Sequence, residues 1–152
     1  MKKFLCVLLC VALAAPAWGA VQKWAKYVND RFSYSIEYPD LFSKRTEPEN
    51  GDGVWMESKD GKTRLTLSGG FNVLMQDGPS MLEERETKGA EKRESGPSWF
   101  RLVRREGGRI IHEYGVVNDD TWASFTFAYP KTADFKAAIR RMERSLRLNG
   151  NN

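Results

Sequence analysis

Large apolar side chains alternate with small or charged ones in residues 32–38. The apolar positions are Phe32, Tyr34, Ile36 and Tyr38. A period of two is typical of a β-strand with one buried face. Pro39 has no amide hydrogen and therefore predicts the end of this strand, which we expect to be the first of the fold, with residues 41–45 as a short continuation.

Asp60-Gly61 separates two further apolar runs and is typical of a type I′ turn, in which both central residues have positive φ. Taking these two residues as the loop predicts the pairing of the flanking strands. The predicted pairs are Glu57 with Arg64, Met56 with Leu65, and Val54 with Leu67. Opposite charges then meet on one face and apolar side chains share the other, which favours this register.

Two more turns predict three consecutive antiparallel strands. Gly107-Gly108 joins residues 99–106 to 109–117, and the turn at residues 118–120 leads into 121–129. Carrying the register through both turns gathers one set of side chains on a single face: Trp99, Val103, Ile110, Tyr114, Val116, Ala123, Phe125, Phe127 and Tyr129. A slip of one residue would move the whole set to the other face, so its coherence predicts a continuous hydrophobic sheet face.

The 3.6-residue period appears in residues 132–146 and predicts an amphipathic helix. Its apolar arc contains Phe135, Ala138, Ile139, Met142 and Leu146, and the opposite side carries Arg140, Arg141, Arg144 and Arg147. We expect this helix to lie on the hydrophobic sheet face and to end at Asn149-Gly150.

A shorter helix is predicted to open at Gly78-Pro79-Ser80, because Ser80 and Glu83 have the spacing of a capping box. Residues 87–98 are charged and contain two glycines and a proline, which predicts a loop around a short edge strand. Together these elements predict an α+β fold: an antiparallel sheet with the C-terminal helix packed on one face and a shorter helix elsewhere.

The first twenty residues are predicted to be a secretory signal peptide rather than part of the fold. Lys2 and Lys3 precede an apolar run, Phe4–Ala15, which is too short to span a bilayer. Small residues follow and predict cleavage after Gly19 or Ala20, with Ala17 left open as an earlier position. Residues 21–152 are then one domain, located in the periplasm or secreted.

Cleavage changes the composition of the mature chain. Cys6 and Cys10 both lie in the leader, so the mature chain is expected to have no disulfide and no thiol nucleophile. Removing two lysines leaves a net charge of (24 − 2) − 20 = +2. This near balance does not indicate nucleic-acid binding, and no later segment is long and apolar enough to predict a transmembrane helix.

Several short motifs, taken in order, resemble the PsbP-like superfamily. They are the aromatic-Ser-aromatic-Ser-Ile-x-Tyr-Pro opening, the Trp-Phe strand, the Gly-Gly turn, the Arg-Ile-Ile-His-Glu-Tyr strand, and the Phe-x-x-Ala-Ile-x-Arg-Met-x-Arg-Ser-Leu ending. The resemblance covers roughly residues 27–146. It implies an antiparallel sheet between helices (an α/β/α sandwich) and a role in binding or assembly without catalysis, but it supplies no partner.

His112 is the only histidine, and the predicted register points it into the apolar face. It could act as a general base or metal ligand, or be a buried residue satisfied by a backbone carbonyl or a nearby tyrosine. A zinc site needs three or four ligands of suitable type, which one histidine without cysteine cannot provide. We therefore expect no cofactor.

Two further features suggest contact surfaces. Arg101, Arg104 and Arg105 lie on one strand, and if they converge with Arg140 and Arg144 they could bind an acidic partner or anionic lipid headgroups; otherwise they form a solvated basic surface. Trp122 is predicted on the sheet face opposite the main core. It is either part of an exposed aromatic patch or part of a second core covered by the short helix.

These observations predict an exported, non-enzymatic binding or accessory protein whose partner is another envelope protein or an acidic surface. One alternative is a carrier with a ligand pocket between sheet and helix, lined by Tyr34, Tyr114, Phe125 and His112. The other is a carboxylate-based hydrolase, which requires two acids converging in a cleft, at least one with a raised pKa.

Overall fold

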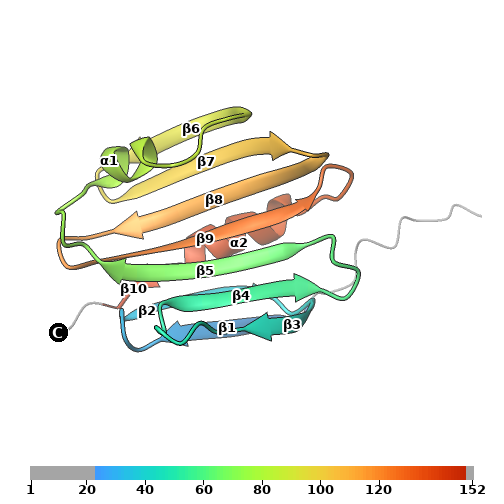
Figure 1. The fold of residues 1–152 in the computed structure, drawn as a ribbon, viewed down its shortest axis with the longest axis horizontal. Helices are drawn as coiled ribbons and strands as arrows, with labels where there is room; N and C mark the ends of the chain where they lie inside the picture. The colour runs from blue at the N-terminus through green and yellow to red at the C-terminus, as the bar shows by residue number, and fades with distance from the viewer. Residues whose placement is uncertain (1–22, 150–152) are drawn as a thin grey trace, which may run out of the picture.

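Residues 23–149, described by a computed structural model, form two antiparallel sheets and two helices (Figure 1). The predicted signal peptide lies outside the described residues. The large sheet has the order β3-β4-β5-β9-β8-β7-β6. Its strands are β3 (Phe42–Thr46), β4 (Gly53–Ser58), β5 (Arg64–Phe71), β6 (Ala90–Gly96), β7 (Trp99–Glu106), β8 (Arg109–Val117) and β9 (Thr121–Pro130). The small sheet has the order β1-β2-β10 and contains β1 (Trp24–Asn29), β2 (Tyr34–Pro39) and β10 (Arg147–Leu148).

The predicted register of β7, β8 and β9 is confirmed. Val103 pairs with His112, and His112 pairs with Phe127. Gly107 and Gly108 both have positive φ, +53° and +80°, as a type I′ turn requires. Phe125 and Phe127 are completely buried. The hydrophobic sheet face inferred from the sequence is therefore the floor of the main core.

The Asp60-Gly61 turn is not of type I′. Gly61 has positive φ (+68°) but Asp60 does not, and the Gly61 amide donates to the Ser58 carbonyl at 2.9 Å. The Asp60 carboxylate instead accepts hydrogen bonds from the Ser58 hydroxyl (2.7 Å) and the Lys62 amide (3.0 Å), which stabilise a different turn. The predicted strand register nevertheless holds, with Val54 opposite Leu67.

The N-terminal strand prediction was partly wrong. The alternating stretch forms β2, the second strand, and β1 precedes it with Tyr27 opposite Ile36. Phe32 lies in the connecting turn, where Ser33 has a φ of +50°. Residues 42–46 do not extend this strand, because β3 pairs with β4 at the edge of the large sheet.

The C-terminal helix α2 (Lys136–Ser145) covers the hydrophobic sheet face as predicted, but it ends earlier than expected. Leu146 is extended (φ −66°, ψ 118°), and the chain continues into β10 beside β2. Helix α2 and the small sheet together cover one face of the large sheet. Their buried side chains include Tyr34, Ile139 and Met142.

Gly69 allows the small sheet to approach β5 closely. A Cβ atom at Gly69 would lie 2.4 Å from Cε1 of Tyr34, far inside van der Waals contact. The Tyr34 ring therefore packs directly on the β5 backbone, and the Tyr34 side chain is completely buried.

The short helix α1 (Gly78–Glu83) lies on the opposite face of the large sheet (Figure 1). Its N-cap is Asp77, whose carboxylate accepts from the Ser80 amide at 2.9 Å, so the predicted capping role of Ser80 was wrong. Met81 and Leu82 pack with Phe100 in a second core cluster, and Trp122 is partly buried against it. The edge strand predicted within residues 87–98 is β6.

Candidate functional site

His112 lies on β8 where α2 crosses the sheet, and it is buried. Its Nε2 is 2.8 Å from Oε1 of Glu143 on α2, and its ring stacks on Phe125 with 6.0 Å between centroids. An ionised carboxylate only accepts hydrogen bonds, so Nε2 carries the proton. The expected partner, a backbone carbonyl or tyrosine, was wrong: a carboxylate from the terminal helix satisfies this histidine.

Arg101 on β7 binds the same carboxylate with two parallel hydrogen bonds. Its Nε is 2.7 Å from Glu143 Oε1 and its Nη2 is 2.8 Å from Glu143 Oε2. The third nitrogen, Nη1, donates to Glu94 on β6 at 2.6 Å. We call His112, Arg101, Glu143 and Glu94 the clasp. It joins β6, β7, β8 and α2 through charge-assisted hydrogen bonds.

The clasp determines the ionisation of its acids. Burial by itself raises the pKa of Glu143, but the hydrogen bonds from His112 and Arg101 outweigh it and lower the pKa from 4.5 to about 2. The pKa of Glu94 is also lowered, by hydrogen bonds from Arg101 and Lys92. The Glu143 hydrogen bonds raise the pKa of Arg101. All three groups therefore remain charged at neutral pH.

An open cleft of about 340 Å³ lies beside the clasp, between α2 and the strands. Four cationic side chains from three elements line it: Lys92, Arg101, Lys136 and Arg140. We call these residues the basic cleft. Lys92 pairs with Glu94 at 3.1 Å, whereas Lys136 and Arg140 form no ion pair with any residue in 23–149. Two of the four cations thus remain available for an anionic ligand.

The structure brings together only some of the residues that the sequence suggested for contact with a partner or ligand. Arg101, Arg140 and His112 meet at the cleft. Arg105 is mostly exposed and pairs with Glu91 at 2.7 Å, and Arg144 is exposed; neither lines the cleft.

Arg104 and Trp122 do not belong to this site, because strand alternation places both on the opposite face of the sheet. Arg104 pairs with Glu106 at 3.0 Å, and Trp122 borders the α1 cluster. The second-core interpretation of Trp122 is therefore the one that describes its position.

Sequence reasoning missed four charged members of the site: Glu143, Glu94, Lys136 and Lys92. The helical period contained a signal for two of them, since residues 136, 140 and 143 are spaced three and four apart and share one face of α2. Only the arginines of that helix were considered. Lys92 gave no such signal, because its position depends on how β6 pairs with β7.

The predicted carrier pocket between sheet and helix is absent where it was expected. Tyr34 and Phe125 are completely buried core residues, so side chains fill that space. His112 borders the basic cleft instead.

The acids also do not match the hydrolase expectation at this cleft. Glu94 and Glu143 do converge, on Arg101, but both have lowered pKa values. Burial raises the pKa of Glu113, which lies on the other face, 3.2 Å from Nε of Arg85. No group of three or more potential metal-ligating side chains occurs within residues 23–149, and no helix in this range is long and apolar enough to cross a membrane.

Comparison with known proteins shows a likeness of fold. No protein-family model and no curated protein sequence matches the chain. The solution structure of cyanobacterial PsbP (CyanoP) from Synechocystis sp. PCC 6803 is similar, with a TM-score of 0.63 and 10% identity over 90% of this chain and 98% of that one. A crystal structure from Bacteroides thetaiotaomicron VPI-5482 has a TM-score of 0.58 and 15% identity, and the match covers 83% of this chain and 48% of that one. The chain therefore has a PsbP-like fold.

Proposed function

We propose that this chain is an exported, non-enzymatic accessory protein that binds an acidic segment of another envelope protein in the basic cleft. The PsbP-like fold is compatible with a binding or accessory role. The leader-like residues 1–20 support export. The observation that carries the proposal is the convergence of four cationic side chains, two of them without an ion-pair partner in residues 23–149.

The clasp gives this cleft a fixed shape. Arg101 is held at both ends by carboxylates, so its charge is largely compensated inside the protein. Lys136 and Arg140 lie four residues apart on α2, and both are exposed. An extended acidic segment placed along α2 would meet these two cations in succession, and the arginine can bind a carboxylate through two hydrogen bonds.

The floor of the cleft favours a peptide over a simple anion. Val103, Tyr129 and Ile139 line it together with the charged residues. Apolar contacts of this kind contribute affinity that charge pairs near solvent do not, since exposed ion pairs contribute at most about 1 kcal/mol. We therefore expect a partner segment that alternates acidic and apolar side chains.

The ionisation of the clasp supports binding over catalysis at this site. A general acid needs a proton to donate, whereas Glu143 stays ionised because its pKa is about 2. The Nε2 proton of His112 is already donated to Glu143. Both groups already have hydrogen-bond partners inside the protein, and we assign them the role of supports for the cationic surface.

A pair of double charge reversals tests the proposal. Lys136→Glu with Arg140→Glu changes the cleft, and Arg105→Glu with Arg144→Glu makes the same change in charge outside it. Recovery of the partner is measured by affinity capture from envelope extract, with a fluorescent peptide of alternating glutamate and valine as a defined probe. We expect the cleft variant to lose at least about tenfold in peptide affinity. Equal losses in both variants would show that net charge, and not the cleft, controls binding.

A further inference from the structure

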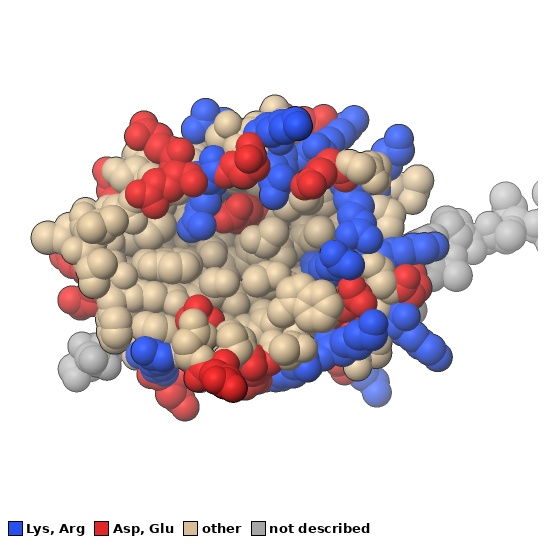
Figure 2. Space-filling view, in the orientation of Figure 1, with Lys and Arg blue, Asp and Glu red and all other residues tan. Residues whose placement is uncertain are grey.

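An exposed apolar loop projects from one end of the molecule, between β5 and α1. Val73, Leu74 and Met75 are 81%, 71% and 79% exposed, and the adjoining Phe71 is 57% exposed. We call these four residues the apolar tip. Figure 2 shows an uncharged projection at this end, with acidic side chains above and below it. Contiguous exposed apolar side chains of this kind mark interaction sites.

The loop that carries the tip is held by one buried side chain. Asn72 donates from Nδ2 to the carbonyls of Gln76 (2.9 Å) and Asn118 (2.8 Å), and its Oδ1 accepts from the Gln76 amide at 2.8 Å. The Asn72 amide donates to the carbonyl of Asp120 at 2.8 Å. The apolar side chains are thus presented in a defined arrangement, which lowers the entropy cost of binding.

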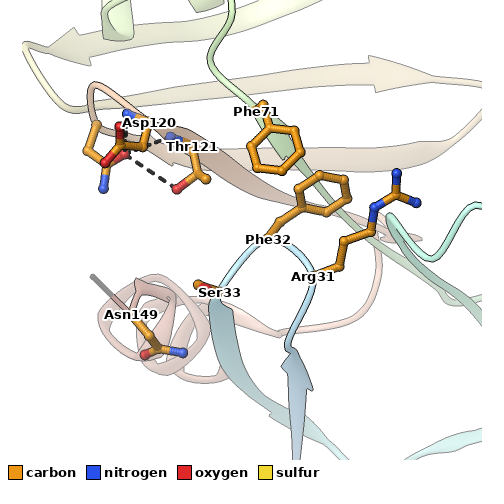
Figure 3. A pocket seen from close by; sticks show the side chains of 8 residues that line it. Arg31, Phe32, Ser33, Phe71, Asp120, Thr121 and Asn149 are labelled. Atoms are coloured by element: carbon orange, nitrogen blue, oxygen red, sulfur yellow. Dashed lines mark hydrogen bonds between the residues drawn. The ribbon is translucent and has the colours of Figure 1, made fainter. Parts of the chain in front are cut away.

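Recesses lie on both sides of the tip, so the tip protrudes from the surface between them. One, of about 380 Å³, is bordered by Phe71, which packs edge-on against Phe32 with 5.0 Å between centroids (Figure 3). The other, of about 220 Å³, is bordered by Leu74, Met81 and other residues of the α1 region. A partner surface could therefore enclose the tip from two sides.

The charges around the tip restrict the chemistry of its partner. Asp77, Glu84, Asp119 and Asp120 surround it and are exposed. Of the two arginines that border the recesses, Arg85 faces Glu113, whereas Arg31 donates to the neutral Asn50 carbonyl and keeps its positive charge beside the four acids. An acidic rim disfavours an anionic lipid surface and favours an apolar groove edged by cations.

The opposite end of the same molecule has such a groove. It has a volume of about 870 Å³, lies between the β4–β5 turn and the β9–α2 connection, and its apolar side chains are Leu41, Pro130, Ala133 and Phe135. Lys59 and Lys62 line it, are exposed, and form no ion pair within residues 23–149. Asp60 also lines it, but its carboxylate accepts hydrogen bonds from the Ser58 hydroxyl and the Lys62 amide. Figure 1 shows the β5–α1 loop at one end of the long axis and the β4–β5 turn and β9–α2 connection at the other, and in Figure 2 Lys and Arg side chains gather at this second end.

We propose that the apolar tip of one copy docks into the lysine-edged groove of a second copy. Each copy then uses its tip on one neighbour and its groove on the other. Such a contact is heterologous, and because tip and groove lie at opposite ends, it generates a linear head-to-tail chain. This surface is separate from the basic cleft, so self-association does not depend on the partner proposed above.

Sedimentation velocity over micromolar to millimolar concentrations tests the contact, using protein expressed with its own leader and purified. We expect the mean mass to rise with concentration and to fall with added salt. Leu74→Asp should weaken association by about 30-fold or more, as expected for a central apolar anchor. Thr87→Asp adds the same charge on an exposed loop and should leave association unchanged. Leu74 is exposed, so both variants should keep the thermal stability of the parent.

Mixing two defective variants gives the decisive result. Leu74→Asp disables the tip and leaves the groove intact. Lys59→Glu with Lys62→Glu disables the groove and leaves the tip intact. Each alone should be monomeric, and their mixture should stop at a two-copy complex. A parent that stays monomeric at every concentration, or a mixture that stays monomeric, overturns the proposal. Flotation of the parent, but not of Leu74→Asp, with neutral phosphatidylcholine vesicles would overturn it in favour of a lipid partner.

Discussion

Replacing Glu143 by glutamine isolates the electrostatic contribution of the clasp. The amide has nearly the same shape and can still accept a hydrogen bond, but it carries no charge to compensate Arg101. Lowering the pKa of Glu143 from 4.5 to about 2 corresponds to about 3 kcal/mol of stabilisation of the ionised form in the folded state. Because the clasp is partly open to solvent, we expect Glu143→Gln to reduce the free energy of unfolding by about 2 kcal/mol at neutral pH.

The pH dependence of this loss follows from the direction of the shift. The folded-state pKa of Glu143 is depressed, so its stabilisation is fully present above the unfolded-state pKa of 4.5 and disappears as the pH falls toward 2. The difference between parent and variant should therefore be constant near neutrality and shrink through this window. Urea unfolding followed by tryptophan fluorescence, at pH values from about 7 to about 3, measures it.

Two comparison variants separate the charge of Glu143 from other effects. Glu47→Gln removes the same charge from an exposed ion pair with Arg45 and should cost less than about 0.5 kcal/mol. His112→Leu keeps the bidentate pair between Glu143 and Arg101, so the protein should stay folded with a loss of about 1 kcal/mol. A Glu143→Gln cost no larger than that of Glu47→Gln, or one independent of pH, would refute the reasoning.

The contact at Gly69 and the leader give two further predictions. Gly69→Ala should lower the free energy of unfolding by about 2 kcal/mol, because its Cβ overlaps the buried Tyr34 ring. Gly107→Ala meets no atom within 4 Å and carries only the strain of its positive φ, about 1 kcal/mol, so it should cost less; thermal denaturation compares them. The mature protein should begin at Ala20 or Val21 and occur in the periplasmic or secreted fraction, as N-terminal sequencing after fractionation would show; an intact Met1 terminus in the cytoplasm would contradict it.

Local pairing explains why much of the large sheet could be predicted. The strands from Trp99 to Pro130 follow one another through tight turns, so turn position and side-chain alternation determine their register. The Asp60-Gly61 hairpin shows how far this extends. Its turn type was predicted incorrectly, yet the opposed charges and apolar pairs still identified the register.

Long-range pairing explains what was missed in the small sheet. β1 has no clean alternation, and β10 is only two residues long. β10 pairs with β2, which lies more than a hundred residues earlier in the chain, so no local sequence pattern predicts this pairing. The same pairing ends α2 at Ser145, because the chain must become extended at Leu146 to reach β2.

Sequence patterns alone predicted the hairpins, the apolar face that they share, the two helices and the position of His112 on that face. These features depend on neighbours in the chain and on fixed side-chain periods. The docking of separate elements is what brings Glu143 to both His112 and Arg101 and places Lys92 at the cleft. It also decided that the apolar tip and the lysine-edged groove lie at opposite ends, because these relations depend on how separate elements dock, and docking depends on side chains far apart in the sequence.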